Sequence, residues 1–284
     1  MAINPASVGN RTPEVLKTWG PLESMLYALG VGAGQGDPRD LPFVTENSAG
    51  APHQVLPTFA VIAGHTGMRP DVGDFDMAKM VHAGQEIRLH QTLSAVGRLS
   101  VITEVAGIHD RGESVLVRLL SRSVDADSGE LVIESESQII IRGEGGFGGE
   151  PAPMRPWHLP DRAPDRELPV LTRPEQALIY RLSGDRNPLH SDPSFAMRAG
   201  FDKPILHGLC TYGASGRVLL HELCGSDPER FVAMSARFTA PVVPGESLTV
   251  EVWEEPSTTL FRTVNAHGRT VLDRGVLTRK EVTA

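Results

Sequence analysis

The sequence predicts an α+β protein made of two related halves, each with an antiparallel sheet and a central helical segment. Two strings recur in the same order: Tyr27–Gly30 resembles Tyr180–Gly184, and Val81–Leu89 resembles Val242–Val250. Several segments alternate β-branched and polar residues, which is typical of strands. One long apolar stretch, Ile205 to Cys224, has helical spacing. A helix packed on an antiparallel sheet, repeated once, is an α+β architecture.

Composition narrows the function classes. A chain of 284 residues, 40% of them hydrophobic, can bury a large core, and 22% charged residues argue against bulk disorder. The net charge of −8 without a long basic run disfavours nucleic acid as a partner. No apolar run is long enough to span a membrane.

Compartment is predicted from the cysteines and the start of the chain. Cys210 and Cys224 form neither a zinc motif nor a disulfide framework, which favours a reducing compartment such as the cytoplasm. The first residues lack the basic start and the apolar run of a signal peptide, so none is expected.

The first half is predicted to span residues 1–142 and to end in strands. Ser114–Arg122 and Glu130–Arg142 have the residue types and partial alternation of strands. Asp110–Gly112 and Asp127–Gly129 are expected to be hairpin turns, because glycine accepts the positive φ that such turns need.

The central helix of this half is expected to be short. It should begin near Leu56-Pro57-Thr58, but Gly64, Gly67 and Pro70 soon interrupt it. The space left by the missing turns is predicted to be an apolar pocket. Its expected lining is Leu56, Phe59, Val61, Ile62 and Met68. The alternative is that the following loop folds back and fills the space.

Residues 143–168 are predicted to be a linker, because they are rich in Gly, Pro, Asp and Arg and show no periodicity. Gly143–Gly148 formally matches a dinucleotide-binding fingerprint. Prolines follow it where that motif requires a helix, so the match is disfavoured. The second half, residues 169–284, should contain the long helix and the strands Ser247–Trp253 and Thr270–Arg279.

The densest polar string is Tyr180–His190. Its Asp-x-Asn-Pro segment predicts a rigid turn, because Asx side chains bond the nearby backbone and proline restricts its neighbour. Across such a turn, Asp185 and His190 can converge on one water and shuttle its protons. The alternative is that Asp185 only orders the turn and His190 only packs.

Gly208 is predicted to lie in the first turn of the long helix. Backbone N–H groups there have no intrahelical partner, and glycine lets a ligand approach closely. Such a group suits an oxygen atom that gains negative charge during a reaction. Close packing of the helix on the sheet explains this glycine equally well.

Taken together, these strings resemble the MaoC-like (R)-specific 2-enoyl-CoA hydratases, or hydratase 2. The resemblance extends over nearly the whole chain and includes the hydratase unit of the peroxisomal multifunctional enzyme type 2. The matching strings are Tyr27–Ala33, Leu56–Phe59, Gly145–Gly149, Tyr180–His190, Gly200–Thr211 and Ala236–Val242.

The resemblance implies a double hotdog fold and a hydro-lyase. It implies that Asp185 and His190 activate the water, that Asn187 helps to position it, and that the Gly208 N–H stabilises the thioester oxygen. Water and proton would add syn to a trans-2-enoyl-CoA, giving a (3R)-3-hydroxyacyl-CoA. Neither a metal nor a redox cofactor is implied, since coenzyme A is part of the substrate.

Other assignments from the resemblance are weaker. The first half keeps the tyrosine string but continues with Val31 and Gly32 in place of Asp and Asn, so it is expected to bind the acyl chain rather than to catalyse. His53, His65, His82 and His90 lack metal-ligand spacing, so surface or core roles are expected. Four residues are candidates for binding substrate or coenzyme A: Glu46, Phe59, Lys203 and Arg237.

Two alternative functions remain open at this point. The first is another hotdog enzyme, a thioesterase or an acyl-carrier dehydratase, since fold alone does not fix function. The second is a non-catalytic acyl-CoA binding subunit. Medium, long or bulky acyl chains are expected, and a homodimer is expected because two-fold dimers are the commonest oligomers.

Overall fold

The fold comes from a computed structural model, which describes residues 3–153, 156–255 and 258–280. The first two residues, on which the expected absence of a signal peptide partly rests, lie outside the described residues, as do residues 154–155 of the expected linker. The strands form one 10-stranded antiparallel sheet in the order β1-β3-β4-β5-β2-β7-β10-β9-β8-β6.

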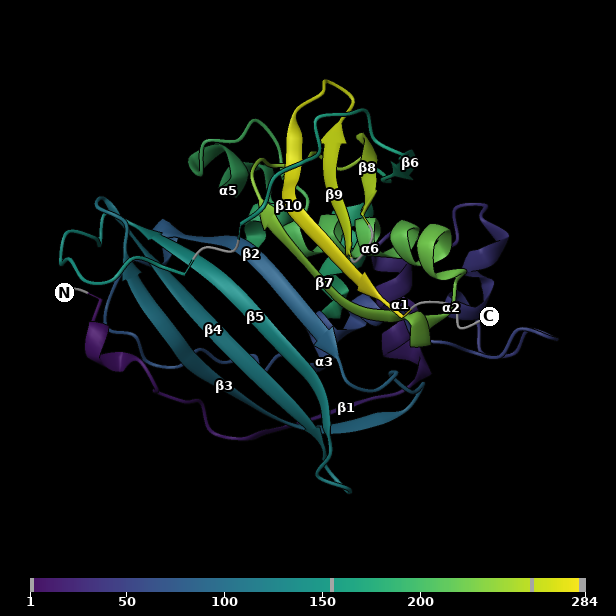
Figure 1. Cartoon of the computed structure of the whole chain (residues 1–284), viewed down its shortest axis with the longest axis horizontal. Coiled ribbons are helices and arrows are strands. Elements are labelled where there is room, and N and C mark those ends of the chain that lie inside the picture. The colour runs from purple at the N-terminus through teal and green to yellow at the C-terminus, as the bar shows by residue number, and fades with distance from the viewer. Residues whose placement is uncertain (1–2, 154–155, 256–257, 281–284) are drawn as a thin grey trace.

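Each half contributes five of these strands and its own helices (Figure 1). The strands and α-helices of the first half are β1 (Val15–Trp19), α1 (Pro21–Gly30), α2 (Leu41–Val44), α3 (Ala60–Ala63), β2 (Met80–Leu89), β3 (Gly97–Asp110), β4 (Ser114–Asp125) and β5 (Leu131–Arg142). Those of the second half are β6 (Arg166–Leu171), α4 (Gln176–Tyr180), α5 (Pro193–Arg198), α6 (Gly208–Cys224), β7 (Phe231–Phe238), β8 (Ser247–Glu255), β9 (Thr258–Asn265) and β10 (Thr270–Arg279). Short 3₁₀ segments are η1 (Pro5–Ser7), η2 (Pro38–Asp40), η3 (Pro57–Phe59), η4 (Met77–Lys79), η5 (Arg181–Ser183), η6 (Pro188–His190) and η7 (Pro228–Arg230).

The two halves have the same topology and meet in the middle of the sheet. The first half has the order β1-β3-β4-β5-β2, and the second has β6-β8-β9-β10-β7. Strands β2 and β7 join the halves, with Ile87 opposite Met234 and Glu86 opposite Ser235. The expected duplication and the α+β class are confirmed.

One of the two recurring strings marks equivalent positions, and the other does not. Tyr27 and Tyr180 lie on the equivalent helices α1 and α4, with ring centroids 6.0 Å apart. The match of Val81–Leu89 to Val242–Val250 is wrong, because β2 is the topological equivalent of β7 and the second string leads into β8. A glycine turn followed by alternation opens many antiparallel strands, so the pattern does not identify which one.

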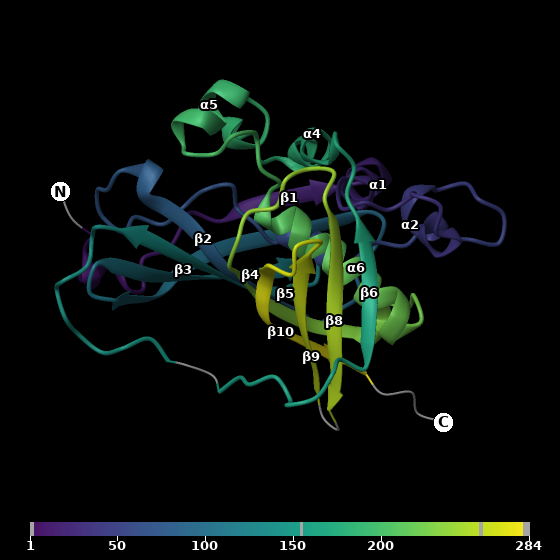
Figure 2. The same ribbon diagram turned by 90° about the horizontal axis from the view of Figure 1, so that it is seen from above.

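The long helix α6 is the centre of the core. It begins at Gly208, three residues later than the predicted Ile205, and ends before Gly225, whose left-handed φ of 65° closes it. Glycines let it pack closely: a Cβ on Gly213 would lie 2.5 Å from the Tyr27 hydroxyl, and one on Gly216 would lie 2.5 Å from Thr58. Helices α1, α4 and α6 lie on one side of β8, β9 and β10 (Figure 2).

The central helix of the first half is short, as predicted. It consists of η3 followed by α3, which ends at Ala63. Part of the expected pocket is filled: Leu56, Phe59 and Val61 are buried in the main core, whereas Met68 is 42% exposed. The loop beyond α3 also packs on the sheet, where Val72 is buried in a second cluster with Val105 and Val115.

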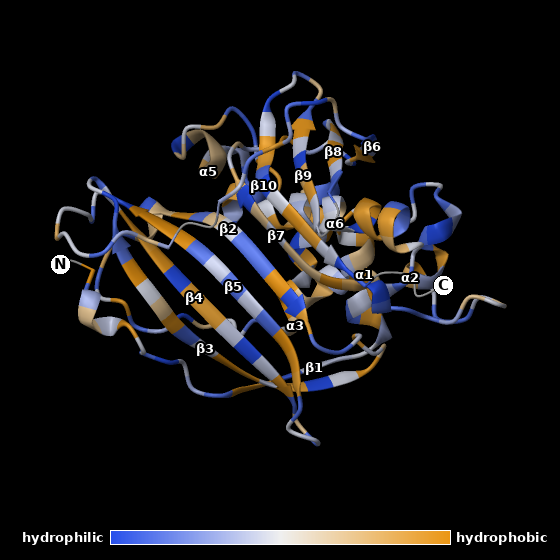
Figure 3. Cartoon of the chain, in the orientation of Figure 1, coloured by the Kyte–Doolittle hydropathy of each residue, from blue (hydrophilic) through white to orange (hydrophobic). Residues whose placement is uncertain are grey.

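The four predicted strands are confirmed with ends that agree within three residues, and residue types alternate along β3, β4 and β5 (Figure 3). The linker ends earlier than expected, because Arg166 already belongs to β6. Its glycine string holds the β3–β4 hairpin, since the N–H groups of Gly146 and Gly148 donate to the Asp110 carboxylate. Within the described part of the chain, no helix combines the length and apolar character needed to cross a bilayer.

Candidate active site

The Asp-x-Asn-Pro segment forms the rigid turn that the sequence predicts. Gly184 has a φ of 130°, which only glycine adopts easily, and it ends η5. The Asp185 carboxylate accepts the Asn187 N–H at 3.0 Å, and the Asn187 side chain accepts the Leu189 N–H at 3.0 Å. Both side chains order the turn and remain exposed to solvent. The turn therefore presents the Asp185 carboxylate to any molecule that enters the site.

His190 is buried at the end of this turn, 9% exposed. Its Nδ1 lies 2.8 Å from the Ile205 carbonyl oxygen. A carbonyl only accepts hydrogen bonds, so Nδ1 carries the proton and Nε2 keeps a lone pair. Burial lowers the pKa of His190, and the Ile205 bond and the charge of Asp185 oppose this shift. The ring is thus held neutral, in the tautomer that a general base needs.

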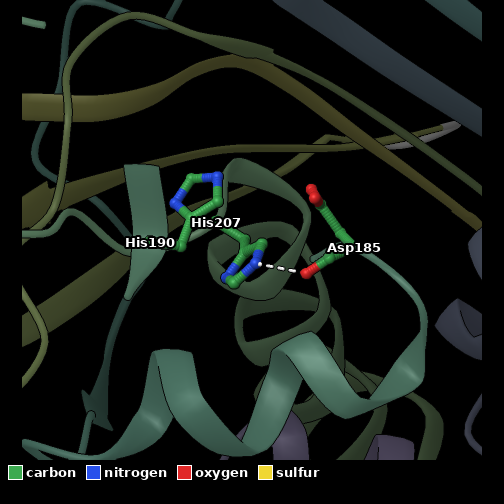
Figure 4. Close-up of side chains that lie close together, drawn as sticks. All are labelled: Asp185, His190 and His207. Carbon is green, nitrogen blue, oxygen red and sulfur yellow. Dashed lines mark hydrogen bonds between the residues drawn. The ribbon is translucent and has the colours of Figure 1, made fainter. Parts of the chain in front are cut away.

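His207 joins the turn to the start of α6. Its Nε2 donates to the Asp185 backbone oxygen at 3.2 Å, and its ring stacks on His190 with centroids 3.7 Å apart and planes 27° apart (Figure 4). Burial and the neighbouring His190 lower the pKa of His207 to about 4. His207 lies within the matching string Gly200–Thr211, and nothing in its local sequence predicts a separate role for it.

Asp185, His190 and His207 could in principle hold a metal, because one ligand atom from each lies within 4.8 Å of the others. The lone pair of an imidazole nitrogen lies in the plane of its ring. Two rings stacked face to face direct their lone pairs side by side rather than at one ion. The arrangement is that of a neutral stacked pair beside a carboxylate.

Gly208 is the first residue of α6, where N–H groups lack intrahelical partners. A Cβ at this position would lie 3.1 Å from the Phe238 ring, so close packing of the helix on β7 requires a small residue. The two explanations of this glycine are therefore compatible.

The first half contributes to this site through His82. The His82 ring packs edge-on against Phe238, with centroids 4.9 Å apart, and its Nε2 donates to the Gly84 oxygen at 3.0 Å. Burial lowers the pKa of His82 to about 4, while the charge of Asp185 acts in the opposite direction. His82 was expected to have only a surface or core role, because nothing in the local sequence shows that β2 meets β7.

Comparison with known proteins identifies the family. Residues 157–275 match the MaoC like domain, and residues 19–143 match the MFE-2 hydratase 2 N-terminal domain. The chain is 50% identical to 3-hydroxyacyl-thioester dehydratase Y of Mycobacterium tuberculosis, over 98% of each chain. The chain belongs to the MaoC-like hydratase 2 family.

Two further proteins are similar to nearly the whole chain at lower identity. The peroxisomal enoyl-CoA hydratase 2 of Arabidopsis thaliana is 36% identical over 93% of this chain and 92% of its own. The crystal structure of a MaoC-like dehydratase from Phytophthora capsici superposes with a TM-score of 0.88, at 28% identity, over 99% of both chains. The expected double hotdog fold is thereby confirmed for this family member.

Glu46, Phe59 and Lys203 have no hydrogen bond to the Asp185–His190 turn of this hydratase 2 family member in the described part of the chain. Glu46 is exposed on the loop after α2, where its charge acts on His53. Phe59 is buried, with its ring 5.8 Å from Trp19 and 5.5 Å from Tyr27. Lys203 is exposed in the segment before α6.

Arg237 points to the sheet face opposite α6, here called the outer face. It shares that face with Ser235, since Met234 packs toward α6. Burial lowers the pKa of Arg237, as do the neighbouring charges of Arg274 and Arg111, while Asp273 opposes the shift. Among the described residues, none of these arginines forms an ion pair. Arg237 and Arg274 border a cavity of about 680 Å³ that the linker partly covers with Pro156 and Trp157.

Proposed function

We propose that the chain hydrates trans-2-enoyl-CoA to (3R)-3-hydroxyacyl-CoA. One observation carries the proposal: the Asp185 carboxylate and a ring nitrogen of His190 lie within 4.8 Å of each other beside the N-terminus of α6, and the bond of Nδ1 to the Ile205 oxygen leaves Nε2 of His190 free. A carboxylate and a neutral imidazole can together bind and polarise one water molecule. A helix N-terminus beside them supplies N–H groups for an oxygen that becomes negative.

In the proposed reaction, the water is held by Asp185, by His190 and, through its side-chain amide, by Asn187. His190 Nε2 accepts a proton as the water oxygen bonds to C3 of the substrate. The thioester carbonyl gains negative charge, which the Gly208 N–H stabilises. The proton then passes from the dyad to C2. Because oxygen and proton come from the same side, the addition is syn.

The names of the relatives support a reversible hydro-lyase. The Arabidopsis relative is named an enoyl-CoA hydratase, and the mycobacterial relative is named a 3-hydroxyacyl-thioester dehydratase. Dehydration is the reverse of hydration, and a catalyst accelerates both directions through one transition state. The direction that the cell uses is set by the concentrations of the two thioesters.

For the coenzyme A phosphates we propose the arginines of the outer face. Beyond the pairing of Gly84 with Arg237, β2 and β7 no longer pair, and His82 and Phe238 meet next to Gly208. A pantetheine arm passing between the halves at this point would reach Arg237, Arg274 and Arg111. Arginine binds phosphate bidentately. Lys203, on the exposed segment before α6, is the second candidate for binding the phosphates. Glu46 makes no contact in the described residues that favours a role in substrate binding.

For the acyl chain we propose the first half, where the central helix is short. Phe59 lies between Trp19 and Tyr27 and would have to turn aside to admit a long or bulky chain. Each methylene buried contributes about 0.8 kcal/mol, so kcat/KM should rise with chain length and then level. Highest kcat/KM on the four-carbon substrate, falling steadily for longer ones, would contradict this assignment.

Oligomeric state, compartment and cofactor requirement complete the proposal. We propose a homodimer that works in the cytoplasm without a metal or redox cofactor. The cysteines favour a reducing compartment, since Cys210 and Cys224 are both free and buried. Light scattering at micromolar concentration tests the dimer, and activity after exhaustive chelation tests the independence from metal.

The deciding experiment is turnover of a series of enoyl-CoA esters with chiral analysis of the product. A hydratase consumes the double bond, leaves the thioester intact and yields the (3R) alcohol. A thioesterase would release free thiol, which a thiol reagent detects in the same samples. A protein that binds acyl-CoA without any turnover would be the non-catalytic subunit, and the proposed activity would then be wrong.

A further inference from the structure

We infer that His207 is a positioning residue for hydration, because one side chain fixes both the Asp185 peptide and the ring of His190. The inference rests on the proposed function and assigns a role to a residue outside the Asp185–His190 pair. His207 itself offers no atom that the proposed reaction uses. It acts through the two residues that touch the water.

The first contact is directional. His207 stands at the N-cap of α6, a position whose side chain commonly accepts a backbone N–H of the first helical turn. Its side chain makes no such bond. It points instead to the catalytic turn, where Nε2 donates to the Asp185 oxygen at 3.2 Å. The start of α6, which carries Gly208, is thereby tied to the residue whose carboxylate binds the water.

The second contact is a stack. One face of the His207 ring lies against His190, at 3.7 Å between centroids, and Tyr180 lies 4.9 Å away at an angle of 50°. Tyr180 and His207 are 1% and 2% exposed, respectively. A ring held on its neighbours in this way limits rotation of His190 and excludes water from the stacked face of that ring.

The stack works only if His207 stays neutral. Its Nε2 donates to the Asp185 backbone oxygen, and its Nδ1 is buried without a hydrogen-bond partner. A second proton, on Nδ1, would therefore have no acceptor. The charged and titratable groups that act on it are His190, Asp185 and Arg181, and the net effect with burial lowers its pKa to about 4. A neutral His207 leaves its neighbour free to take the proton of the water, whereas a charged one would repel that proton.

Two substitutions separate the contacts. His207→Gln keeps an N–H donor within reach of the Asp185 oxygen but removes the ring. His207→Phe keeps a ring to stack on His190 but removes the donor. Val218→Ala, a buried change elsewhere in α6, is the control for general loss of packing.

The expected results differ between the two variants. His207→Phe should lose kcat by about tenfold to a hundredfold, because Asp185 is no longer held in place. His207→Gln should keep a larger share of kcat at high pH. Its acid limb of kcat/KM should move to higher pH, because water reaches His190 and the pKa of that base returns toward its ordinary value. Val218→Ala should leave the acid limb where it is.

Nitrogen NMR of His190 gives a readout that does not depend on turnover. The wild type and His207→Phe should show the Nδ1–H tautomer alone, whereas His207→Gln should show a mixture, because without the stacked ring His190 can turn away from the Ile205 oxygen. Unchanged kcat, acid limb and tautomer in both variants would overturn the inference. Failure of the wild type to hydrate any enoyl-CoA would instead overturn the proposed function. In that case, a tautomer mixture at His190 in His207→Gln would still support the contacts by which His207 positions His190.

Discussion

The two halves share one topology, but they use the loop that follows the equivalent helices α1 and α4 in opposite ways. In the second half that loop exposes Asp185 beside two neutral histidines. In the first half the loop carries Asp40, which is 1% exposed and bonded to Arg217 and His221 of α6. The same region thus holds an exposed carboxylate, the proposed catalytic one, in one half and a buried, ion-paired carboxylate in the other.

The lengths of the central helices explain the difference. Helix α6 has 17 residues and α3 has 4, so α6 extends past its partner and carries Arg217 and His221 to the loop of the first half. Burial raises the pKa of Asp40, but hydrogen bonds from His221 and Gly34 and the charge of Arg217 bring it below the ordinary value. In the first half, the loop therefore carries an ion pair and a hydrogen bond that join the two halves.

The largest expected effect comes from removing the reactive carboxylate or its partner. Asp185→Asn and His190→Ala should each reduce kcat by a factor on the order of 10² to 10⁴, the usual contribution of acid–base groups. Steady-state hydration of an enoyl-CoA measures this. Asp202→Asn, an exposed carboxylate nearby in sequence, should keep near wild-type kcat. More than about a tenth of wild-type turnover in either variant would remove that residue from the mechanism.

Removing the charge of Asp40 should lower the stability of the fold rather than the rate of turnover. Asp40→Asn leaves Arg217 buried without its counter-charge, so the free energy of unfolding should fall by about 3–5 kcal/mol. Urea denaturation measures the loss. Asp37→Asn removes a partly exposed ion pair with Arg39, whose effect should be within about 1 kcal/mol. Equal stability of the two variants would show that the contacts of Asp40 with Arg217 and His221 do not stabilise the fold.

The sequence predicts the local parts of this comparison well. The strands, the long helix and the short first-half helix follow from alternation, helical spacing and the interrupting Gly64, Gly67 and Pro70. The turn from Asp185 to Leu189 follows from Asx and proline chemistry within a single string. Each of these features depends on residues that are close in the chain.

The long-range parts could not be predicted in the same way. His82 meets the site only because β2 pairs with β7, and Arg274 meets Arg237 only because β10 pairs with β7. The wrong match of the β2 string to the β8 string has the same origin, since short patterns do not encode strand order. Asp40 carries no local signal, because its partners lie on a helix far along the chain.

The outer-face arginines offer a smaller effect that tests whether the substrate spans both halves. Arg237→Gln should raise KM by about tenfold to a hundredfold with little change in kcat, because a charge-assisted hydrogen bond to phosphate contributes about 1.5–3 kcal/mol. Arg166→Gln, whose guanidinium is already paired with Glu254, is the matched control. With 3′-dephospho-CoA thioesters the difference between wild type and variant should shrink if Arg237 binds that phosphate. An unchanged KM in the variant would move the phosphates elsewhere, with Lys203 the next residue to test.

The smallest effect concerns His82, through which the first half reaches the site of the second. In the folded chain the pKa of His82 is about 4, against 6.5 for an ordinary histidine. The unfolded chain therefore binds more protons than the folded chain between these values, so stability is fully present above pH 6.5 and is lost as the pH falls toward 4. Between pH 7.5 and 5.5 the loss due to His82 should be about 1 kcal/mol. His82→Gln keeps a donor for the Gly84 oxygen and cannot titrate, so its stability should fall less steeply over that range. Parallel urea titrations of the two proteins at several pH values measure the difference. Identical slopes would mean that His82 is solvated in the folded chain, and the first half would then contribute packing alone to the active site.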